Sequence, residues 1–243
     1  MQPVLFEDLG MMRYQKAWDY QELLLAEMVG AKSKQKQDLD NGRDLQDANT
    51  GLTHRLLFVE HPSVYTLGKS GKMENVLISE EELHSKGIEF FKINRGGDIT
   101  FHGIGQLVGY PILDLEQFYT DIGRYLRNIE EVIIRTMAHY GLVGERSPGE
   151  TGVWLDASIP GKERKICAIG VRCSRWVTMH GFAFNVNTDL GFFENIIPCG
   201  IRQKQVTSME KELGSILDLE EVKSIVRSKF EEVFDVQLVT ADD

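Results

Sequence analysis

Cysteine is scarce in this chain, which has only Cys167, Cys173 and Cys199 among 243 residues. An odd and sparse count of this kind excludes a disulfide framework. The sequence contains no CxxC pair and no HExxH motif, so it gives no support for a structural zinc site or a zincin, and we expect no metal. This cysteine usage is typical of a reduced, soluble, cytoplasmic protein.

Long apolar runs and excess positive charge are also missing. No stretch approaches the ~18 apolar residues that a membrane span needs, and the first residues lack the basic and apolar regions of a signal peptide. Lys and Arg number 27 against 37 for Asp and Glu, which gives a formal net charge of −10. This acidic balance argues against nucleic acid or a membrane surface as a partner, because both attract basic proteins.

The apolar pattern that is present predicts an α+β fold. Hydrophobic residues make up 42% of the chain, which is an ordinary content for a globular protein. Helical periodicity predicts helices over 13–29, 121–140 and 219–234. Strand patterns occur at 56–59, 88–93, 106–115, 151–155, 165–172, 176–186 and 236–239. Strands that follow strands, with a few long helices, favour a mixed or antiparallel sheet with flanking helices, and we expect one domain over residues 1–243.

Residues 31–53 stand apart because they have almost no large apolar side chains. Gly30 is a plausible stop for the helix before them. A segment of this composition cannot bury a core, so we predict an exposed loop or a locally disordered insertion over 31–53.

Glycines gather in the segment 95–106, RGGDITFHGIGQ, which has four of them in twelve residues. Glycines allow left-handed turns and the close approach of a backbone to a ligand. The segment is no Walker A motif, because no GK[ST] follows, and it is no Rossmann fingerprint. Two interpretations stay open: a tight hairpin, or a loop pair that lines a pocket with Arg95 and His102 near its ends.

Lys165 opens a strand-like segment that also carries Cys167 and Cys173. A lysine at a strand end is usually exposed, but near a thiol it would lower the pKa of that thiol and pass protons. The three residues occupy odd positions on one strand, so we expect their side chains on one face. We interpret Cys167 and Cys173 as packing residues.

Cys199 lies between Pro198 and Gly200, a sequence that predicts a turn. A cysteine at a turn has little reason to pack in a core, so a nucleophile is the alternative to a packing role. In 180–186, HGFAFNV, the residues alternate with a period of two, as in a strand, and the small residues Gly181 and Ala183 would leave room for an acyl chain.

Together these segments resemble the lipoyl(octanoyl) transferase family, which is similar in fold to the biotin and lipoate protein ligases. The similarity runs from about residue 54 to about residue 202 and rests on an ordered series of motifs. These are EHPSVYTLG at 60–68, RGGDITFHGIGQ at 95–106, YPI at 110–112, KICAIGVR at 165–172, HGFAFNV at 180–186 and PCGI at 198–201.

The resemblance implies an enzyme that moves an octanoyl group from octanoyl-acyl carrier protein to a lysine of lipoyl domains, those of 2-oxoacid dehydrogenase complexes and the glycine cleavage H protein. It implies Cys199 as the acyl-thioester nucleophile and Lys165 as its partner, without ATP, metal or other cofactor. The implied substrate-binding residues are Arg95, Gly96, Gly97, Asp98, Ile99, Thr100, Phe101, His102, Ala168, Ile169, Gly170, Gly181, Phe182 and Ala183.

Two positions depart from the family pattern, because Ile104 replaces a usual proline and Phe101 a usual tyrosine. Three other functions remain open: an ATP-dependent ligase, a non-catalytic acyl binder and a thioesterase. Carrier proteins and lipoyl domains are typically acidic, so docking would need a local basic patch. The candidates for that patch are Lys162, Arg164, Arg172, Arg175, Arg202 and Lys204.

Overall fold

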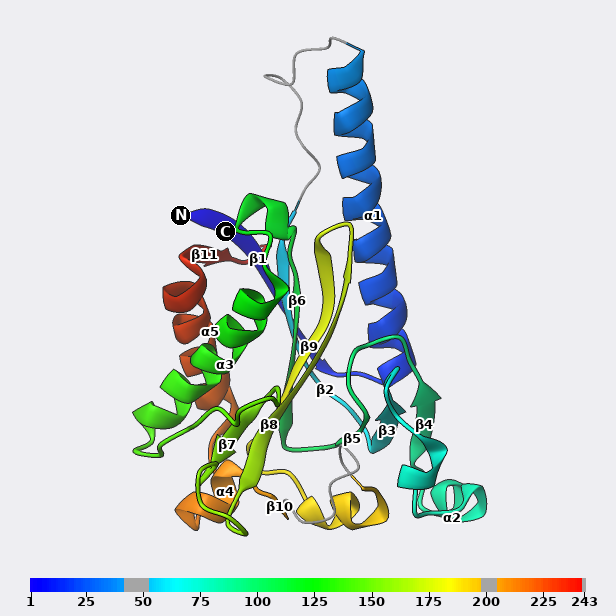
Figure 1. Cartoon of the computed structure of the whole chain (residues 1–243), viewed down its shortest axis with the longest axis vertical. Helices are drawn as coiled ribbons and strands as arrows, with labels where there is room; N and C mark the ends of the chain where they lie inside the picture. Colours follow the sequence, from blue (N-terminus) through cyan, green and yellow to red (C-terminus); the bar gives the residue numbers. More distant parts are fainter. Residues whose placement is uncertain (42–52, 198–204, 242–243) are drawn as a thin grey trace.

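The fold is built on two sheets, and the computed structural model describes it for residues 1–41, 53–197 and 205–241 (Figure 1). The larger sheet has eight strands in the order β10-β8-β9-β6-β2-β1-β11, with β7 pairing on β8. The smaller has three, in the order β4-β3-β5. Both sheets mix parallel and antiparallel pairs, which confirms the α+β class and the mixed sheet predicted from the sequence.

The strands of the larger sheet are β1 (Gln2–Met11), β2 (Arg55–Glu60), β6 (Gln106–Ile112), β7 (Val153–Leu155), β8 (Arg164–Ser174), β9 (Val177–Asn185), β10 (Gln205–Val206) and β11 (Val236–Val239). Those of the smaller sheet are β3 (Val64–Leu67), β4 (Glu89–Lys92) and β5 (Ile99–His102). The helices are α1 (Tyr14–Asp40), α2 (Glu80–Ser85), α3 (Ile122–His139), α4 (Met209–Leu213) and α5 (Leu219–Phe234), with short 3₁₀ turns at η1 (Met73–Asn75), η2 (Leu115–Gln117) and η3 (Leu190–Asn195).

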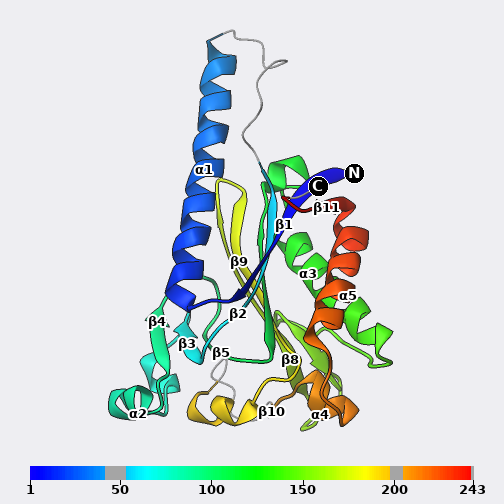
Figure 2. The same cartoon turned by 180° about the vertical axis from the view of Figure 1, so that it is seen from behind.

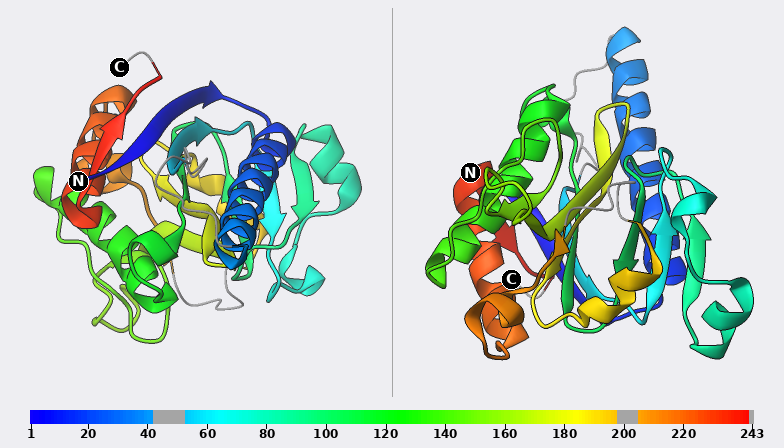
Figure 3. Two further views of the ribbon diagram at one scale, coloured as in Figure 1. Left: turned by 90° about the horizontal axis from the view of Figure 1, so that it is seen from above. Right: turned by 60° about the horizontal axis from the view of Figure 1, so that its bottom comes forward.

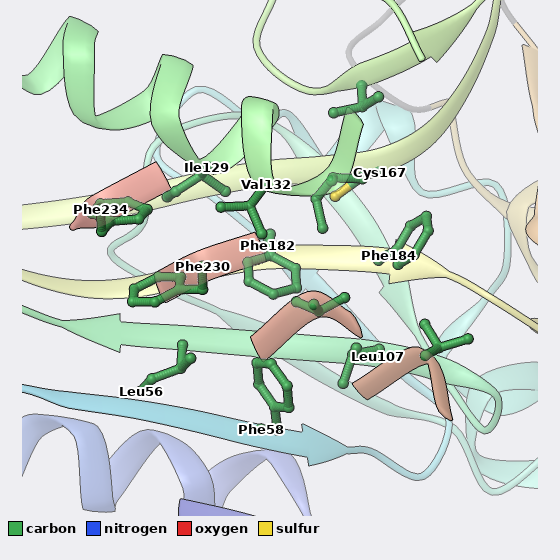
Figure 4. Packing of buried hydrophobic residues seen from close by; sticks show 14 of the residues in the cluster. Leu56, Phe58, Leu107, Ile129, Val132, Cys167, Phe182, Phe184, Phe230 and Phe234 are labelled. Carbon is green, nitrogen blue, oxygen red and sulfur yellow. The ribbon is translucent and has the colours of Figure 1, made fainter. Parts of the chain in front are cut away.

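Long helices cover both faces of the larger sheet, with α3 and α5 on one side and α1 on the other (Figures 2 and 3). The apolar stripe of α3 places Ile129 and Val132 in a core shared with Phe230 of α5 and with the sheet (Figure 4). Burial of such side chains stabilises the fold by roughly 2 kcal/mol each. A second, separate cluster of buried apolar residues lies between α1 and the face of the larger sheet that this helix covers.

Capping residues set the helix starts that the sequence predicts. The carboxylate of Asp121 accepts a hydrogen bond from the amide of Arg124 at the start of α3, and that of Asp218 accepts from Glu220 at the start of α5. Both helices end within two residues of their predicted ends. Among strands, β1, β3 and β10 were missed by the sequence patterns.

The prediction of a loop over 31–53 is wrong for its first part. Helix α1 passes Gly30 and continues to Asp40, while 42–52 lie outside the described residues. The cause is that a shortage of apolar side chains rules out a core position but does not prevent a helix, and Ala, Lys and Gln are good helix formers. Lys32 then fixes the extension by donating to the Asp114 carboxylate and to the Arg175 carbonyl at 2.9 Å.

Pro111 lies in β6, a strand in the interior of the larger sheet. Pro111 pairs with Leu56 of β2, but the pairing of β6 with β9 ends at Gly109. A proline is tolerated there because the strand no longer needs its missing amide donor on the β9 side. In the described parts of the chain, no helix is long and apolar enough to cross a membrane.

Candidate active site

A cavity of about 680 Å³ lies between the two sheets, where β5 and the loop before it face β8 and β9. The start of α1, through Tyr14, and the loop 149–151 also contribute to its wall. It is lined by fourteen residues that the sequence predicted for the site: Arg95, Gly96, Gly97, Asp98, Ile99, Thr100, His102, Lys165, Ala168, Ile169, Gly170, Gly181, Phe182 and Ala183.

Phe101 is the predicted pocket residue that the structure places elsewhere. Its ring stacks on Phe192 at a centroid distance of 4.6 Å, within the core of the smaller sheet. The reason is strand alternation, which turns Phe101 away from the cavity while Thr100 and His102 line it. Its replacement of the family's tyrosine therefore removes no hydroxyl from the cavity.

Glycines let the loop before β5 lie directly on β8. The Gly96 amide donates to the Val171 carbonyl at 2.9 Å, on the edge of β8 that faces away from β9. A Cβ on Gly170 would come within 2.8 Å of the Gly96 carbonyl oxygen. Gly170 lies opposite Gly181, where a Cβ would come within 2.1 Å of the Gly109 carbonyl oxygen, so both positions require glycine.

Arg95 is buried and locks this loop to the smaller sheet. Its guanidinium donates to the Thr66 carbonyl at 2.8 Å and to the Thr66 hydroxyl at 3.1 Å. That hydroxyl lies 3.3 Å from Nε2 of His102. Burial is the main cause that holds the pKa of His102 well below its ordinary value, and the nearby charge of Arg95 acts in the same direction, so the ring is neutral.

The hydrogen-bond chain continues from His102 across the cavity wall. His102 Nδ1 donates to Gln106 Oε1 at 2.9 Å, and Gln106 Nε2 donates to Asn185 Oδ1 at 2.9 Å. Asn185 in turn donates to the Thr207 carbonyl at 3.0 Å, and the Thr207 amide donates to the carbonyl of Lys165 at 2.9 Å. The chain fixes β5, β6, β9 and the start of β8 relative to one another.

Lys165 reaches the cavity because β8 bulges directly after it. Val153 pairs with Cys167 and Trp154 with Lys165, so two consecutive residues of β7 lie opposite three residues of β8. The extra residue, Ile166, breaks the alternation of faces. Lys165 therefore points to the cavity side, with Nζ 4.5 Å from the centre of the Trp154 ring.

Cys167 lies on the opposite face from Lys165, so the prediction that the two share a face is wrong. Its thiol is fully buried in the α3–α5 core, and burial raises the pKa of that thiol far above its ordinary value. Cys173, near the far end of β8, has its pKa raised in the same direction by partial burial. Neither is suited to be a thiolate nucleophile.

Aromatic and histidine side chains of the cavity wall were missed or left without a role. Tyr14 and Tyr110 line the cavity, and His61 lies behind them. His61 donates from Nδ1 to the Met12 carbonyl and accepts at Nε2 from the Tyr110 hydroxyl, each at 2.7 Å. Burial lowers the pKa of His61 to about 4, so it serves here as a neutral hydrogen-bonding spacer. In the sequence, the helical periodicity over 13–29 was the only signal that Tyr14 faces the interior of the protein.

His180 occupies a strained position on β9, with φ of 57°. Its Nε2 lies 2.9 Å from the side-chain oxygen of Asn94, whose amide nitrogen donates to Glu22 at 3.0 Å. This orients Asn94 as the acceptor and His180 as the Nε2–H tautomer. Burial, with Arg95 and Arg172 nearby, lowers the pKa of His180 to about 3, so the ring is neutral.

Cys199, Arg202 and Lys204 lie outside the described residues. The chain leaves the described part at Ile197, whose amide donates to the Asn75 carbonyl at 2.8 Å. It returns at Gln205, and Val206 lines the cavity and pairs with Lys165.

Two of the predicted docking cations are engaged in ion pairs within the chain. Arg164 binds Glu212 at 2.6 Å and also Asp156, and Arg172 binds Glu22 at 2.7 Å. Lys162 and Arg175 are exposed. Across 1–41, 53–197 and 205–241, no group of His, Cys, Asp and Glu side chains is arranged to hold a metal ion.

Comparison with solved structures defines the class by its fold. The bi-partite lipoate protein ligase of Thermoplasma acidophilum superposes with a TM-score of 0.68 at 16% identity, covering 99% of this chain and 87% of that one. A lipoate-protein ligase A bound with ATP gives 0.65 at 15% identity, covering 98% and 88%. The fold is thus that of the lipoate protein ligases.

The sequence comparisons name the family. The model for the lipoyl protein ligase A/B catalytic domain matches residues 13–231, and the chain belongs to this family. Octanoyltransferase of Christiangramia forsetii is 57% identical over 95% of both chains, and that of Flavobacterium johnsoniae is 56% identical over 97% of this chain and 98% of its own. The resemblance to the octanoyltransferases predicted from the motifs is confirmed.

Proposed function

We propose that this chain is an octanoyltransferase that moves an octanoyl group from octanoyl-acyl carrier protein to the lysine amine of lipoyl domains. The acceptors are the lipoyl domains of 2-oxoacid dehydrogenase complexes and the glycine cleavage H protein, and the reaction is the first step of endogenous lipoate formation. The observation that carries the proposal is an identity of 57% and 56% to two octanoyltransferases over 95% and 97% of this chain. The reaction needs no ATP, because the acyl group of a thioester donor is already activated.

In the first half-reaction, the thiolate of Cys199 attacks the carbonyl carbon of the donor thioester. A bond forms between this carbon and the Cys199 sulfur as the bond to the carrier sulfur breaks. The departing thiolate takes a proton from the Lys165 ammonium and leaves as a thiol, so the Lys165 amine is neutral for the second half-reaction. An ordinary cysteine is only a few per cent thiolate at neutral pH. The ammonium of Lys165 favours the thiolate, since an opposite charge stabilises the ionised form.

In the second half-reaction, the acceptor lysine attacks the octanoyl-Cys199 thioester. The new amide bond forms as the bond to sulfur breaks, and the proton lost by the amine passes through Lys165 to the departing sulfur. Backbone amides of the glycine-rich turns stabilise the oxyanion. Donor and acceptor use one site in turn, so the kinetics are ping-pong.

Two features of the described residues support this assignment. Lys165 lies in the cavity wall together with the glycine-rich loop, and the bulge in β8 keeps the Cys167 thiol on the opposite face of the sheet. Val206, which follows the Cys199 segment, pairs with Lys165. A thiol nucleophile must stay reduced, which suits the cytoplasm.

The test is an intact-mass spectrum of the protein mixed with octanoyl-acyl carrier protein. We expect a single octanoyl adduct that is discharged by an added lipoyl domain. The adduct is lost in Cys199→Ala, formed slowly in Lys165→Ala and retained in the control Cys173→Ala.

Two results would contradict the proposal. Acylation of the lipoyl domain only with ATP and free octanoate would identify a ligase. Rapid release of octanoate from the adduct without an acceptor would identify a thioesterase.

A further inference from the structure

Glu130 is a fully buried carboxylate on α3 that takes no part in the proposed reaction. Its Oε2 accepts from Arg127 at 2.6 Å and from Arg146 at 3.1 Å, and its Oε1 accepts from the Gly152 amide at 3.1 Å. A buried carboxylate is costly unless it is paired and hydrogen-bonded. The two arginines are partly exposed, whereas the bond to Gly152 is buried.

Gly152 is the point where this carboxylate meets the cavity wall. It directly follows Gly149, Glu150 and Thr151, which line the cavity. Its φ of 127° is open to glycine but not to other residues. A Cβ at this position would come within 2.6 Å of the Cys167 carbonyl oxygen, so Gly152 is pressed directly against β8.

The stem of Lys165 lies against the same residue. Its Cε and Cδ would lie 3.5 and 3.6 Å from a Gly152 Cβ, and its ammonium group lies over the Trp154 ring, two residues further along. A shift of Gly152 would therefore move the surface on which the Lys165 stem rests. Glu130 is the side chain that holds the Gly152 amide from the α3 side.

We propose that Glu130 is a positioning residue for Lys165, acting through the hydrogen bond to Gly152 and the contact of Gly152 with the lysine stem. This inference rests on the proposed function, in which Lys165 is a catalytic residue. A misplacement of a reacting group by a fraction of an ångström is enough to slow a reaction severalfold.

The experiment measures the single-turnover rate of octanoyl transfer from octanoyl-acyl carrier protein to the enzyme. Glu130→Leu removes every acceptor at similar size and is expected to lower this rate about tenfold, with a smaller change in the KM for the donor. Glu130→Gln loses the ion pairs but keeps an oxygen that accepts from Gly152, so it is expected to restore the rate to within about twofold of the original.

Glu131→Leu is the matched control. Glu131 is the next residue and accepts from Arg146 at 2.7 Å and from Arg135 at 2.9 Å, rather than from the Gly152 amide. Its loss is expected to leave the transfer rate within about twofold. Gly152→Ala approaches the contact from the other side and is expected to slow transfer as Glu130→Leu does.

A double-mutant cycle with Lys165→Ala separates positioning from general damage. If Glu130 acts through Lys165, then Glu130→Leu has less than about a twofold effect on the residual rate of Lys165→Ala. An equal tenfold effect in both backgrounds would overturn the inference and leave the proposed function intact. A normal rate in Lys165→Ala itself would overturn the Lys165 role in the proposed function, and the inference with it.

Discussion

Lys165 and Cys167 are two residues apart on β8, yet they face opposite sides of the larger sheet. In a regular strand the two side chains would lie on one face. The extra residue between them, Ile166, places the Lys165 side chain in the cavity and the Cys167 side chain in the core. The lysine is thereby separated from the nearest thiol in sequence.

The first prediction concerns that thiol. Cys167→Ala is expected to leave octanoylation within about twofold of the original rate, because the side chain is buried away from the cavity. It is expected to lower the free energy of unfolding by about 1 kcal/mol, since a small buried group is lost. Intact mass and chemical denaturation measure the two effects, with Cys199→Ala as the comparison. Loss of the adduct in Cys167→Ala would make Cys167 the reacting thiol.

A second prediction concerns the residue that anchors the chain ahead of Cys199. Asn75 accepts the Ile197 amide with its carbonyl, and its side chain donates to Asp98 at 2.8 Å. The other oxygen of Asp98 accepts from the Ile99 amide, so this carboxylate is occupied within the chain although it lines the cavity. Asn75→Ala keeps the backbone carbonyl but removes the side-chain bond to Asp98 that holds this residue in place. It is expected to slow octanoylation about fivefold at little cost in melting temperature.

The exposed neighbour Glu74 provides the control for Asn75. Glu74→Ala is expected to leave the octanoylation rate unchanged, because its side chain pairs only with the exposed Lys72 within the described residues. Single-turnover kinetics measure both variants. Equal rates in Asn75→Ala and the unmodified protein would show that the side-chain bond between Asn75 and Asp98 has no bearing on the reaction.

A third prediction concerns pH and stability. The folded pKa values of His61 and His180, about 4 and about 3, lie below the ordinary value of 6.5. Below pH 6.5 the unfolded chain therefore binds protons at these two histidines that the folded chain does not. Their contribution to the free energy of unfolding is fully present above pH 6.5 and is lost as the pH falls toward 4. Each histidine accounts for about 2 kcal/mol of that loss at pH 5.

Urea denaturation between pH 6 and pH 5 measures this slope. His61→Gln is expected to reduce it by up to about 1.4 kcal/mol per pH unit, the full effect of one proton. His139, exposed near the end of α3, supplies the control, and His139→Gln is expected to keep the original slope. An unchanged slope in His61→Gln would mean that His61 is protonated in the folded protein as readily as in the unfolded one.

A fourth prediction concerns the extension of α1. Lys32 pairs with Asp114, whose side chain is only 3% exposed, and with Glu116 at 3.0 Å. Lys32→Met is expected to lower the free energy of unfolding by roughly 3 kcal/mol, because it leaves a buried carboxylate without its cation. Lys36→Met, on the exposed part of the same helix, is expected to change it by less than about 0.5 kcal/mol. Similar values for the two variants would mean that the ion pair contributes little to stability.

The sequence predicts those parts of the fold that depend on local pattern. The apolar stripe of α3 and the strands on either side of this helix in the sequence follow from periodicity. The helical extension to Asp40 could not be predicted in this way, because it depends on Asp114, far away in the sequence. Propensity alone does not report such a tertiary partner.

The same division holds for the candidate site. The glycine-rich loop stands out by its composition. Lys165 follows Lys162 and Arg164 and is singled out only by the resemblance to the octanoyltransferases. Tyr14 lines the cavity but looks in the sequence like an ordinary core-facing residue of its helix. Glu130 looks like a surface charge on α3, and the sequence does not indicate that it is buried. The bulge at Ile166 leaves no mark in the sequence, since it arises from the pairing of β8 with β7.

Residues at the two extremes of the chain meet in the larger sheet, where Gln2 lies beside Val236 and Leu5 beside Val239 in a parallel pair. During synthesis on the ribosome, β1 can join β2 early, but its other edge must wait for β11, more than two hundred residues later. Until then β1 is an open edge strand, able to pair with a neighbouring nascent chain. Completion of the sheet is therefore a late event in biogenesis, and the cavity is assembled from segments that emerge before the sheet is closed.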